Sequence, residues 1–94
     1  MTEFALGEAA VLGLMAERGI VRLLGEAMRD PAEARGVPRA ELYLVVDDAD
    51  VFQRRALAAG AREIDGVRAR DWGHRAGYVA DPDGHVVAFA SRLV

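Results

Sequence analysis

The chain has 94 residues, 52% of them hydrophobic, and its 12 basic against 15 acidic residues give a formal net charge of -3. This length allows one small hydrophobic core, and the slightly acidic balance gives no attraction for nucleic acid or an anionic membrane. Cysteine is absent, which excludes disulfides, thiolate zinc sites and cysteine nucleophiles. Because the longest apolar runs are strand-sized and no signal-like segment opens the chain, we expect a cytoplasmic protein.

The first half predicts strands followed by a polar connector. Phe4–Leu6 is a short apolar run that ends in a turn at Gly7. Two longer apolar runs, Ala10–Met15 and Gly19–Leu24, contain β-branched residues and favour a hairpin, although the first run could also be helical. Glu26–Arg39 is polar and contains proline and glycine, so we expect a connector with at most one helical turn.

A strand and a helix are expected at the start of the second half. Almost every residue of Glu41–Val46 is apolar, which favours a central strand covered on both faces. In the following helix Asp47, Asp48 and Asp50 offer caps for the start, and Gly60 is a natural end. One stripe of the helix should pack on the sheet while its polar residues stay in solvent. The stripe comprises Val51, Phe52, Ala56 and Ala59, and the expected solvent-exposed residues are Gln53, Arg54 and Arg55.

Antiparallel strands are expected from there to the C-terminus. A short strand at 62–64 leads through a loop at Gly66 to strands at 67–72 and 75–80. A tight turn at 81–84 precedes the last strand at 85–93, because proline fixes φ in this turn and Gly84 can take a positive φ. The second half thus predicts a strand, a helix and an antiparallel meander, and the whole chain an α+β fold.

Spaced motifs in this half resemble the vicinal oxygen chelate superfamily, which includes glyoxalases, bleomycin-resistance proteins and extradiol dioxygenases. The motifs are Glu41–Asp48, Ala58–Ala61, Trp72-Gly73, Tyr78 and Asp81–His85. The resemblance implies βαβββ modules, paired so that their sheet curves around a ligand. It implies a partial first module of strands at 1–25, a connector at 26–39 and a complete second module at 40–94, in a single compact domain. The first module would lack its opening strand and helix.

Such a truncated module would leave apolar surface and a sheet edge exposed, which natural proteins normally cover. Paired modules in this family often come from two chains. We therefore expect a homodimer with an intersubunit ligand cup or an exchanged segment. The alternative is that Met1 is an internal start of a longer gene.

The resemblance also allows a test for metal. Metal-dependent relatives bind a divalent ion through His and Glu on the first and last strands of each module. Glu41 is the one surviving candidate ligand, because Ala88 and Arg22 stand where last-strand ligands would be and the fourth position falls in the missing segment. One carboxylate does not hold a divalent ion. We predict no metal and no other cofactor.

The two histidines, His74 and His85, each flank a turn, and neither has a chelating partner nearby in sequence. We expect both to bond to the backbone, because a general base needs a nearby acid and a concave site. Asp81 and Asp83 should cap the backbone amides of their own turn. Ser91 has no evident activating base, so we predict no catalytic residue.

Candidate ligand contacts follow from the family's use of the concave sheet face. Arg70, Trp72, Arg75 and Tyr78 lie on or beside the later strands. Trp and Tyr offer stacking faces, and Arg can clamp a carboxylate or phosphate. The alternative is that Trp72 seals the core at a strand end and that the arginines are solvated.

Three functions remain open at this point. The first is a metal-free, dimeric small-molecule binding protein, similar to resistance proteins that bind an antibiotic. The second is a metal-dependent lyase, isomerase or dioxygenase completed by dimerisation, with Glu41 as a ligand. The third is a fragment without independent activity. The loss of metal ligands favours the first and argues against an enzyme.

Overall fold

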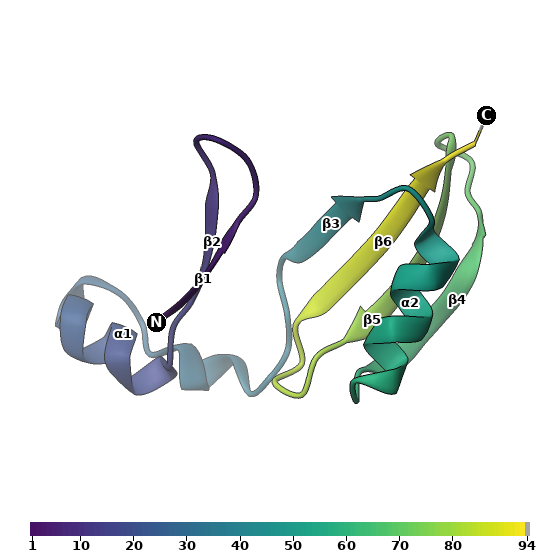
Figure 1. The fold of residues 1–94 in the computed structure, drawn as a ribbon. Coiled ribbons are helices and arrows are strands. Elements are labelled where there is room, and N and C mark those ends of the chain that lie inside the picture. Colours follow the sequence, from purple (N-terminus) through teal and green to yellow (C-terminus); the bar gives the residue numbers. More distant parts are fainter. Residues whose placement is uncertain (94) are drawn as a thin grey trace. The chain divides into compact units, whose positions relative to one another are not determined.

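The computed structural model describes residues 1–93, which divide into two compact units, one over Met1–Arg35 and one from Gly36 onward (Figure 1). We expected a single compact domain with a connector at 26–39, and the division falls inside that segment. None of the helices within these residues is long and apolar enough to cross a membrane.

The N-terminal unit contains a hairpin and a helix. Strands β1 (Thr2–Ala5) and β2 (Val11–Leu14) pair antiparallel. Helix α1 (Glu17–Leu24) and two short 3-10 turns, η1 (Gly25–Ala27) and η2 (Pro31–Ala34), follow. The prediction that this part consists of strands alone is therefore wrong. The β2 segment is a strand as expected, but it pairs with β1, and the run predicted as its partner is α1.

Residue spacing explains why α1 is a helix. Ile20, Leu23 and Leu24 fall at i, i+3 and i+4 and so share one helical face. Glu17 in the first turn suits the positive end of the helix dipole. Gly25 ends the helix with a φ of 54°, which favours glycine. A short apolar run does not by itself distinguish a strand from a helix, and here the spacing and the glycine decide.

The C-terminal unit packs one helix on one face of a four-stranded sheet (Figure 1). Its elements are β3 (Glu41–Val45), α2 (Ala49–Ala58), β4 (Arg62–Ala69), β5 (His74–Ala80) and β6 (Val86–Arg92). The strand order is β3-β6-β5-β4, with β3 parallel to β6 and the other neighbours antiparallel. This order confirms the predicted βαβββ arrangement and the α+β class.

Strand β3 lies at an edge of the sheet, which corrects its prediction as a central strand. Its outer edge pairs with no strand within residues 1–93. Leu44 is the register partner of Phe89, on the face that α2 covers, while Val45 projects to the opposite face and is 52% exposed. Helix α2 therefore covers one face of the apolar strand β3. The opposite face of the strand is also apolar but has no helix over it.

Strand β4 is continuous, so the predicted loop at Gly66 is wrong. The register between β4 and β5 shifts between Glu63 and Asp65, and again between Asp65 and Arg68. Such irregularities accommodate extra residues without ending a strand. The glycine therefore marks an irregular stretch inside one strand rather than a connection between two.

Small side chains build the interior of this unit. The buried apolar residues are Ala49, Ala76, Val79, Ala80, Ala88 and Ala90. No large side chain is fully buried among the described residues. Phe52 of α2 and Phe89 of β6 pack with ring centroids 5.8 Å apart, which confirms Phe52 as part of the predicted stripe, whereas Ala59 lies past the end of α2 and is exposed. Because hydrophobic stabilisation scales with buried area, this alanine-rich core supplies a modest driving force for folding.

The start of α2 has one of the predicted caps, and one helix residue that was predicted to be exposed is buried. Asp48 is the N-cap and accepts from the amide of Val51 at 3.2 Å. Gln53, which was predicted to lie in solvent, is 3% exposed. Its Nε2 donates to the carbonyl of Asp65 at 3.0 Å, and Gly77 on β5 leaves space for its amide group. Because Gly77 has no side chain, the sheet leaves room for Gln53. The periodicity of the helix alone does not reveal this space.

Candidate functional site

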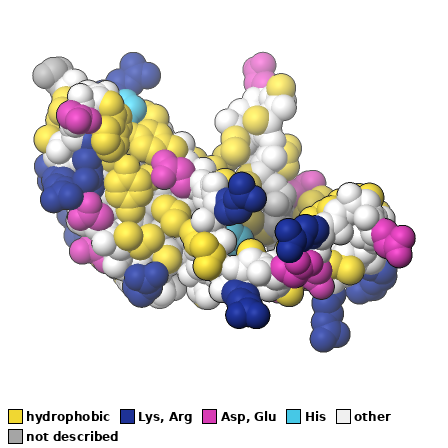
Figure 2. Space-filling model, turned by 180° about the vertical axis from the view of Figure 1, so that it is seen from behind, with side chains coloured by type: hydrophobic (Ala, Val, Ile, Leu, Met, Phe, Trp, Pro, Cys, Tyr) yellow, Lys and Arg dark blue, Asp and Glu magenta, His cyan; other side chains and the backbone are white. Residues whose placement is uncertain are grey.

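The sheet register places the side chains of the C-terminal unit on two faces. Tyr43, Ala88 and Tyr78 are successive cross-strand partners and share one face. Phe89, next to Ala88, projects to the other face, where it meets Phe52 of α2. We name the face of Tyr43 and Tyr78 the open face, because α2 packs on the opposite one. Figure 2, viewed from the side away from α2, shows hydrophobic side chains gathered over the sheet.

Alanines form the floor of the open face. Ala76, Ala88 and Ala90 are each 0% exposed, although they project away from α2. An alanine side chain ends at Cβ, so its complete burial requires larger neighbours. Tyr43 and Tyr78 are the cross-strand partners of Ala88 and rise beside this floor. The open face thus combines small residues at its base with aromatic residues around them.

Tyr43 is at the centre of a hydrogen-bonded aromatic cluster. Trp72 Nε1–H donates to the Tyr43 hydroxyl at 2.8 Å, and this hydroxyl lies 2.6 Å from His74 Nδ1. The Tyr43 and His74 rings stack with centroids 5.7 Å apart. Trp72 is 53% exposed. The cluster, defined as Tyr43, Trp72 and His74, ties the edge strand β3 to the β4–β5 turn and presents aromatic surface to solvent.

Arg70 is held by partners within the sheet. Its guanidinium donates to the Asp65 carboxylate at 3.1 Å and to the carbonyls of Gly66 and Ala76. Its Cζ lies 5.2 Å from the centroid of the Tyr78 ring. The hydrogen bond from Arg70 lowers the pKa of Asp65. Arg70 therefore supports Tyr78 and the irregular part of β4, and most of its donors are already used.

Tyr78 has a stacking face and a neutral hydroxyl. Burial raises the pKa of Tyr78, and the negative charge of Glu41 acts in the same direction. Glu41 lies on the open face as well, because it alternates with Tyr43 along β3. The open face thus carries the carboxylate of Glu41 beside its aromatic residues, in addition to that of Asp65, which is paired with Arg70.

Arg75 lies on the other face of the sheet. It pairs in register with Ser91, whose hydroxyl accepts from the amide of Ala49 in α2. Its guanidinium forms a two-point ion pair with Asp50, at 2.8 Å and 3.1 Å. This hydrogen bond to Arg75 lowers the pKa of Asp50. Of the four candidate contacts, the structure brings Arg70, Trp72 and Tyr78 to one side, while Arg75 fastens α2 to the sheet.

The residues around Glu41 do not suit a divalent ion. Its register partner on β6 is Val86, and the next β6 residue on this face is Ala88. Neither side chain has an oxygen or nitrogen that could bind a metal. Tyr43 and Tyr78 add neutral hydroxyls, which are poor ligands beside carboxylates and imidazoles. This donor set provides one metal-binding carboxylate where a stable site needs at least three ligands.

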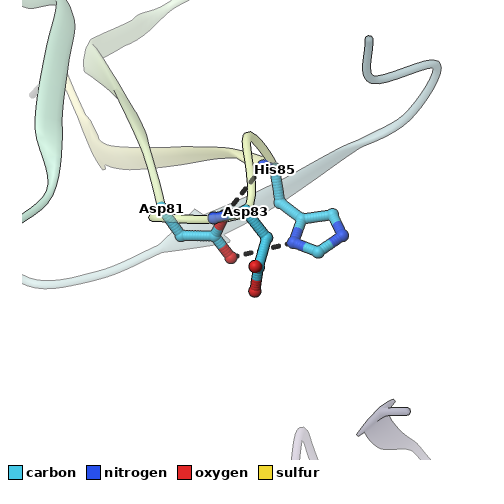
Figure 3. A group of neighbouring side chains, drawn as sticks. All are labelled: Asp81, Asp83 and His85. Carbon is cyan, nitrogen blue, oxygen red and sulfur yellow. Dashed lines mark hydrogen bonds and ion pairs between the residues drawn. The ribbon is translucent and has the colours of Figure 1, made fainter. Parts of the chain in front are cut away.

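A second group of polar residues lies at the β5–β6 turn (Figure 3). Oxygen and nitrogen atoms of Asp81, Asp83 and His85 come within 4.8 Å of one another. Asp81 Oδ1 accepts from the amides of Asp83 and His85, each at 2.9 Å, which confirms that Asp81 caps its own turn. Its other oxygen lies 2.8 Å from His85 Nδ1. Burial alone would raise the pKa of Asp81, but the hydrogen bonds from His85 outweigh it and lower the pKa. These contacts stabilise the turn, which explains why the three residues lie together.

Comparison with known families gives the chain its relatives. A model of the glyoxalase-like domain matches residues 5–90. The chain belongs to the glyoxalase-like domain family. This membership agrees with the motifs that resemble the vicinal oxygen chelate superfamily, and with the βαβββ order of the C-terminal unit.

Proteins of unknown function are among the relatives of this glyoxalase-like domain. Uncharacterized proteins from Mycobacterium bovis and Mycobacterium tuberculosis are 35% identical over 72 residues, or 77% of this chain. The matched region covers 47% and 42% of these relatives, so the chain spans about half of their length. A solved structure of a protein of unknown function from Agrobacterium tumefaciens superposes with a TM-score of 0.61 at 24% identity, over 81% of this chain and 58% of that one. This likeness concerns the fold.

Sequence reasoning missed Tyr43, the residue that joins Trp72 to His74. In the sequence, Glu41 is a candidate metal ligand, and the rest of its strand is predicted to lie in the core. Alternation along a strand places every second side chain on one face, so Glu41 and Tyr43 had to lie together. The contact of Tyr43 with His74, 31 positions later in sequence, depends on strand order and could not be predicted from spacing.

Proposed function

We propose that this glyoxalase-like domain binds a small organic molecule on its open face without a metal ion. The observation that supports this most directly is the exposed aromatic cluster of Tyr43, Trp72 and His74 beside the alanine floor. Aromatic rings with polar edges, next to small residues, suit a flat and partly apolar ligand. Trp72 and Tyr78 would provide the stacking faces, and Arg70 would hold Tyr78 in place.

The chemistry of the face favours binding over metal catalysis. Glu41 lies among aliphatic and phenolic neighbours, and the other carboxylate of this face, Asp65, is paired with Arg70. This set does not supply the three or more ligands that a catalytic divalent ion requires. A binding protein requires only complementary shape and a few polar contacts, which the cluster can supply.

A homodimer is the second part of the proposal. The outer edge of β3 is unpaired within residues 1–93, and exposed β edges are normally covered. No residue of the N-terminal unit is buried, and many of its large apolar side chains are exposed. These are Met1, Phe4, Leu6, Val11, Leu14, Met15, Leu23, Leu24 and Met28. A second copy of the chain would cover such surface and could complete the ligand cup.

The alternative is a metal-dependent lyase, isomerase or dioxygenase whose site is completed by dimerisation. The exposed Glu41 carboxylate on the open face favours it, because a partner chain could add ligands there. The metal content of protein purified without added metal distinguishes the two functions. We expect far less than one divalent ion per chain. A stoichiometric ion that is lost in Glu41→Gln but kept in Asp83→Asn would support the enzyme instead.

Tryptophan emission tests the binding function directly. Trp72 is the sole tryptophan of the chain, so its emission reports on the open face alone. A panel of planar aromatic molecules should include some that change this emission in a saturable way. Tyr78→Leu, which keeps apolar bulk but removes the flat ring, should weaken that binding. Arg54→Ala, an exposed change on α2, is the matched control. A panel without any saturable response would reject the proposal.

A further inference from the structure

The hydrogen bonds of Tyr43 define what its oxygen can still accept. A tyrosine hydroxyl has one hydrogen to donate and two lone pairs that accept. Trp72 Nε1–H is a donor only, so it occupies one lone pair at 2.8 Å. The Tyr43 oxygen lies 2.6 Å from His74 Nδ1, and the direction of this hydrogen bond depends on the histidine tautomer. In the tautomer with the proton on Nε2, Nδ1 accepts from the Tyr43 hydroxyl, and one lone pair of the Tyr43 oxygen remains for a ligand.

The other groups of the open face reinforce this polarity. Glu41 adds a carboxylate, which also accepts hydrogen bonds. Arg70, the strongest donor on this side, already donates to Asp65 and to two backbone carbonyls. Tyr43 and Glu41 thus offer acceptors next to the stacking faces of Trp72 and Tyr78.

We propose that the Tyr43 hydroxyl is the polar anchor of the binding site and selects a planar aromatic ligand with an O–H or N–H at its edge. This inference rests on the proposed binding function and specifies its ligand class. Trp72 and His74 fix the orientation of the hydroxyl, so its free lone pair is prepared for a donor before the ligand arrives. Pre-organisation of this kind reduces the entropy lost on binding.

Matched naphthalene probes test the ligand class on the full chain. Binding of 2-naphthol, 2-methoxynaphthalene and 2-naphthoate is measured by chemical-shift titration of the Trp72 indole N–H near pH 8. We expect 2-naphthol to bind roughly fivefold to tenfold more tightly than its methyl ether, the difference that one hydrogen bond makes. Tyr43→Phe should remove this preference while both probes still bind. 2-Naphthoate, which has no hydrogen to donate at this pH, should bind no more tightly than the ether.

One control variant and three adverse results complete the test. His85→Gln at the β5–β6 turn should leave the preference for 2-naphthol unchanged. Equal binding of 2-naphthol and its ether would overturn the anchor role and leave the binding function intact. A preference that survives in Tyr43→Phe would overturn it too. If none of the three probes binds, the proposed binding function fails together with this inference.

Discussion

Gln53 of α2 occupies the space that a side chain on Gly77 would fill. A Cβ at Gly77 would lie 2.7 Å from Gln53 Oε1 and 2.6 Å from Val67 Cγ2, closer than atoms of these types pack. Gln53 is 3% exposed, and its Nε2 bonds the carbonyl of Asp65 on β4. This contact therefore joins the helix to two strands of the sheet, and it requires glycine on β5.

Replacing Gly77 by alanine should destabilise the protein. The added methyl group forces either the helix or β4 to shift, and overpacking of this kind costs about 1–3 kcal/mol. Urea denaturation followed by circular dichroism measures the change in unfolding free energy. Gly66→Ala is the matched control, because a Cβ there meets its nearest atom, Glu63 Oε1, at an ordinary 3.9 Å. Equal stability of the two variants would contradict the close approach.

The ion pair between Asp50 and Arg75 should make stability depend on pH. Its hydrogen bond lowers the pKa of Asp50 below the ordinary 3.8. A carboxyl group with a depressed folded-state pKa contributes stability above its unfolded pKa, and that contribution is lost as the pH falls through the folded value. Asp50→Asn should therefore be less stable than wild type near neutral pH, and the difference should shrink as the pH falls below 3.8 and through the depressed pKa of Asp50 in the folded protein.

The size of this effect is limited, because both side chains are more than a third exposed and solvent screens the pair. Urea midpoints measured from neutral to acidic pH give the difference between variant and wild type. Asp47→Asn, an exposed aspartate just before α2, controls for the loss of a surface charge. A difference that stays constant with pH would show that the variant acts through packing and not through the charge of Asp50.

Some parts of this fold could be predicted from the sequence, and others could not. Asp48 and Gly60 bound α2 in sequence and in structure, because caps act within one helical turn. The position of β3 at an edge could not be found in this way, since strand order depends on contacts across the whole unit. Gln53 shows the same limit: its burial depends on Gly77, which lies on another element. Local chemistry was predictable, and properties that need two distant segments were not.

The site follows the same pattern. Trp72 and Tyr78 were found because aromatic side chains on late strands are uncommon and suit a ligand. Arg75 was placed with them by residue type, but Tyr78, three positions further along a strand, must point to the opposite face. Strict alternation would have separated these two. The bond between Tyr43 and His74 required the strand order β3-β6-β5 to be known.

Removing the Asp81 side chain should destabilise the β5–β6 turn. Its Oδ1 accepts from two backbone amides, and Asp81→Ala leaves both without this partner. We expect a loss of about 1 kcal/mol in unfolding free energy, as for other lost caps. Asp81→Asn keeps an acceptor oxygen and should lose less. Thermal unfolding of the three proteins ranks them, with Asp83→Ala as the control. A larger loss of unfolding free energy in Asp83→Ala than in Asp81→Ala would show that Asp83 is the residue that stabilises the turn.

The chain should be a homodimer in solution. Its C-terminal core contains no fully buried large side chain among the described residues, and β3 ends the sheet without a neighbour within residues 1–93. Size-exclusion chromatography with light scattering should therefore give twice the chain mass of 10.1 kDa. Val45→Lys places a charge on the edge strand, which opposes pairing with another strand and should shift the mass toward one chain. Arg54→Ala on α2 should leave it unchanged. A wild-type protein that is folded and elutes with the mass of one chain at all concentrations would show that the exposed edge needs no partner.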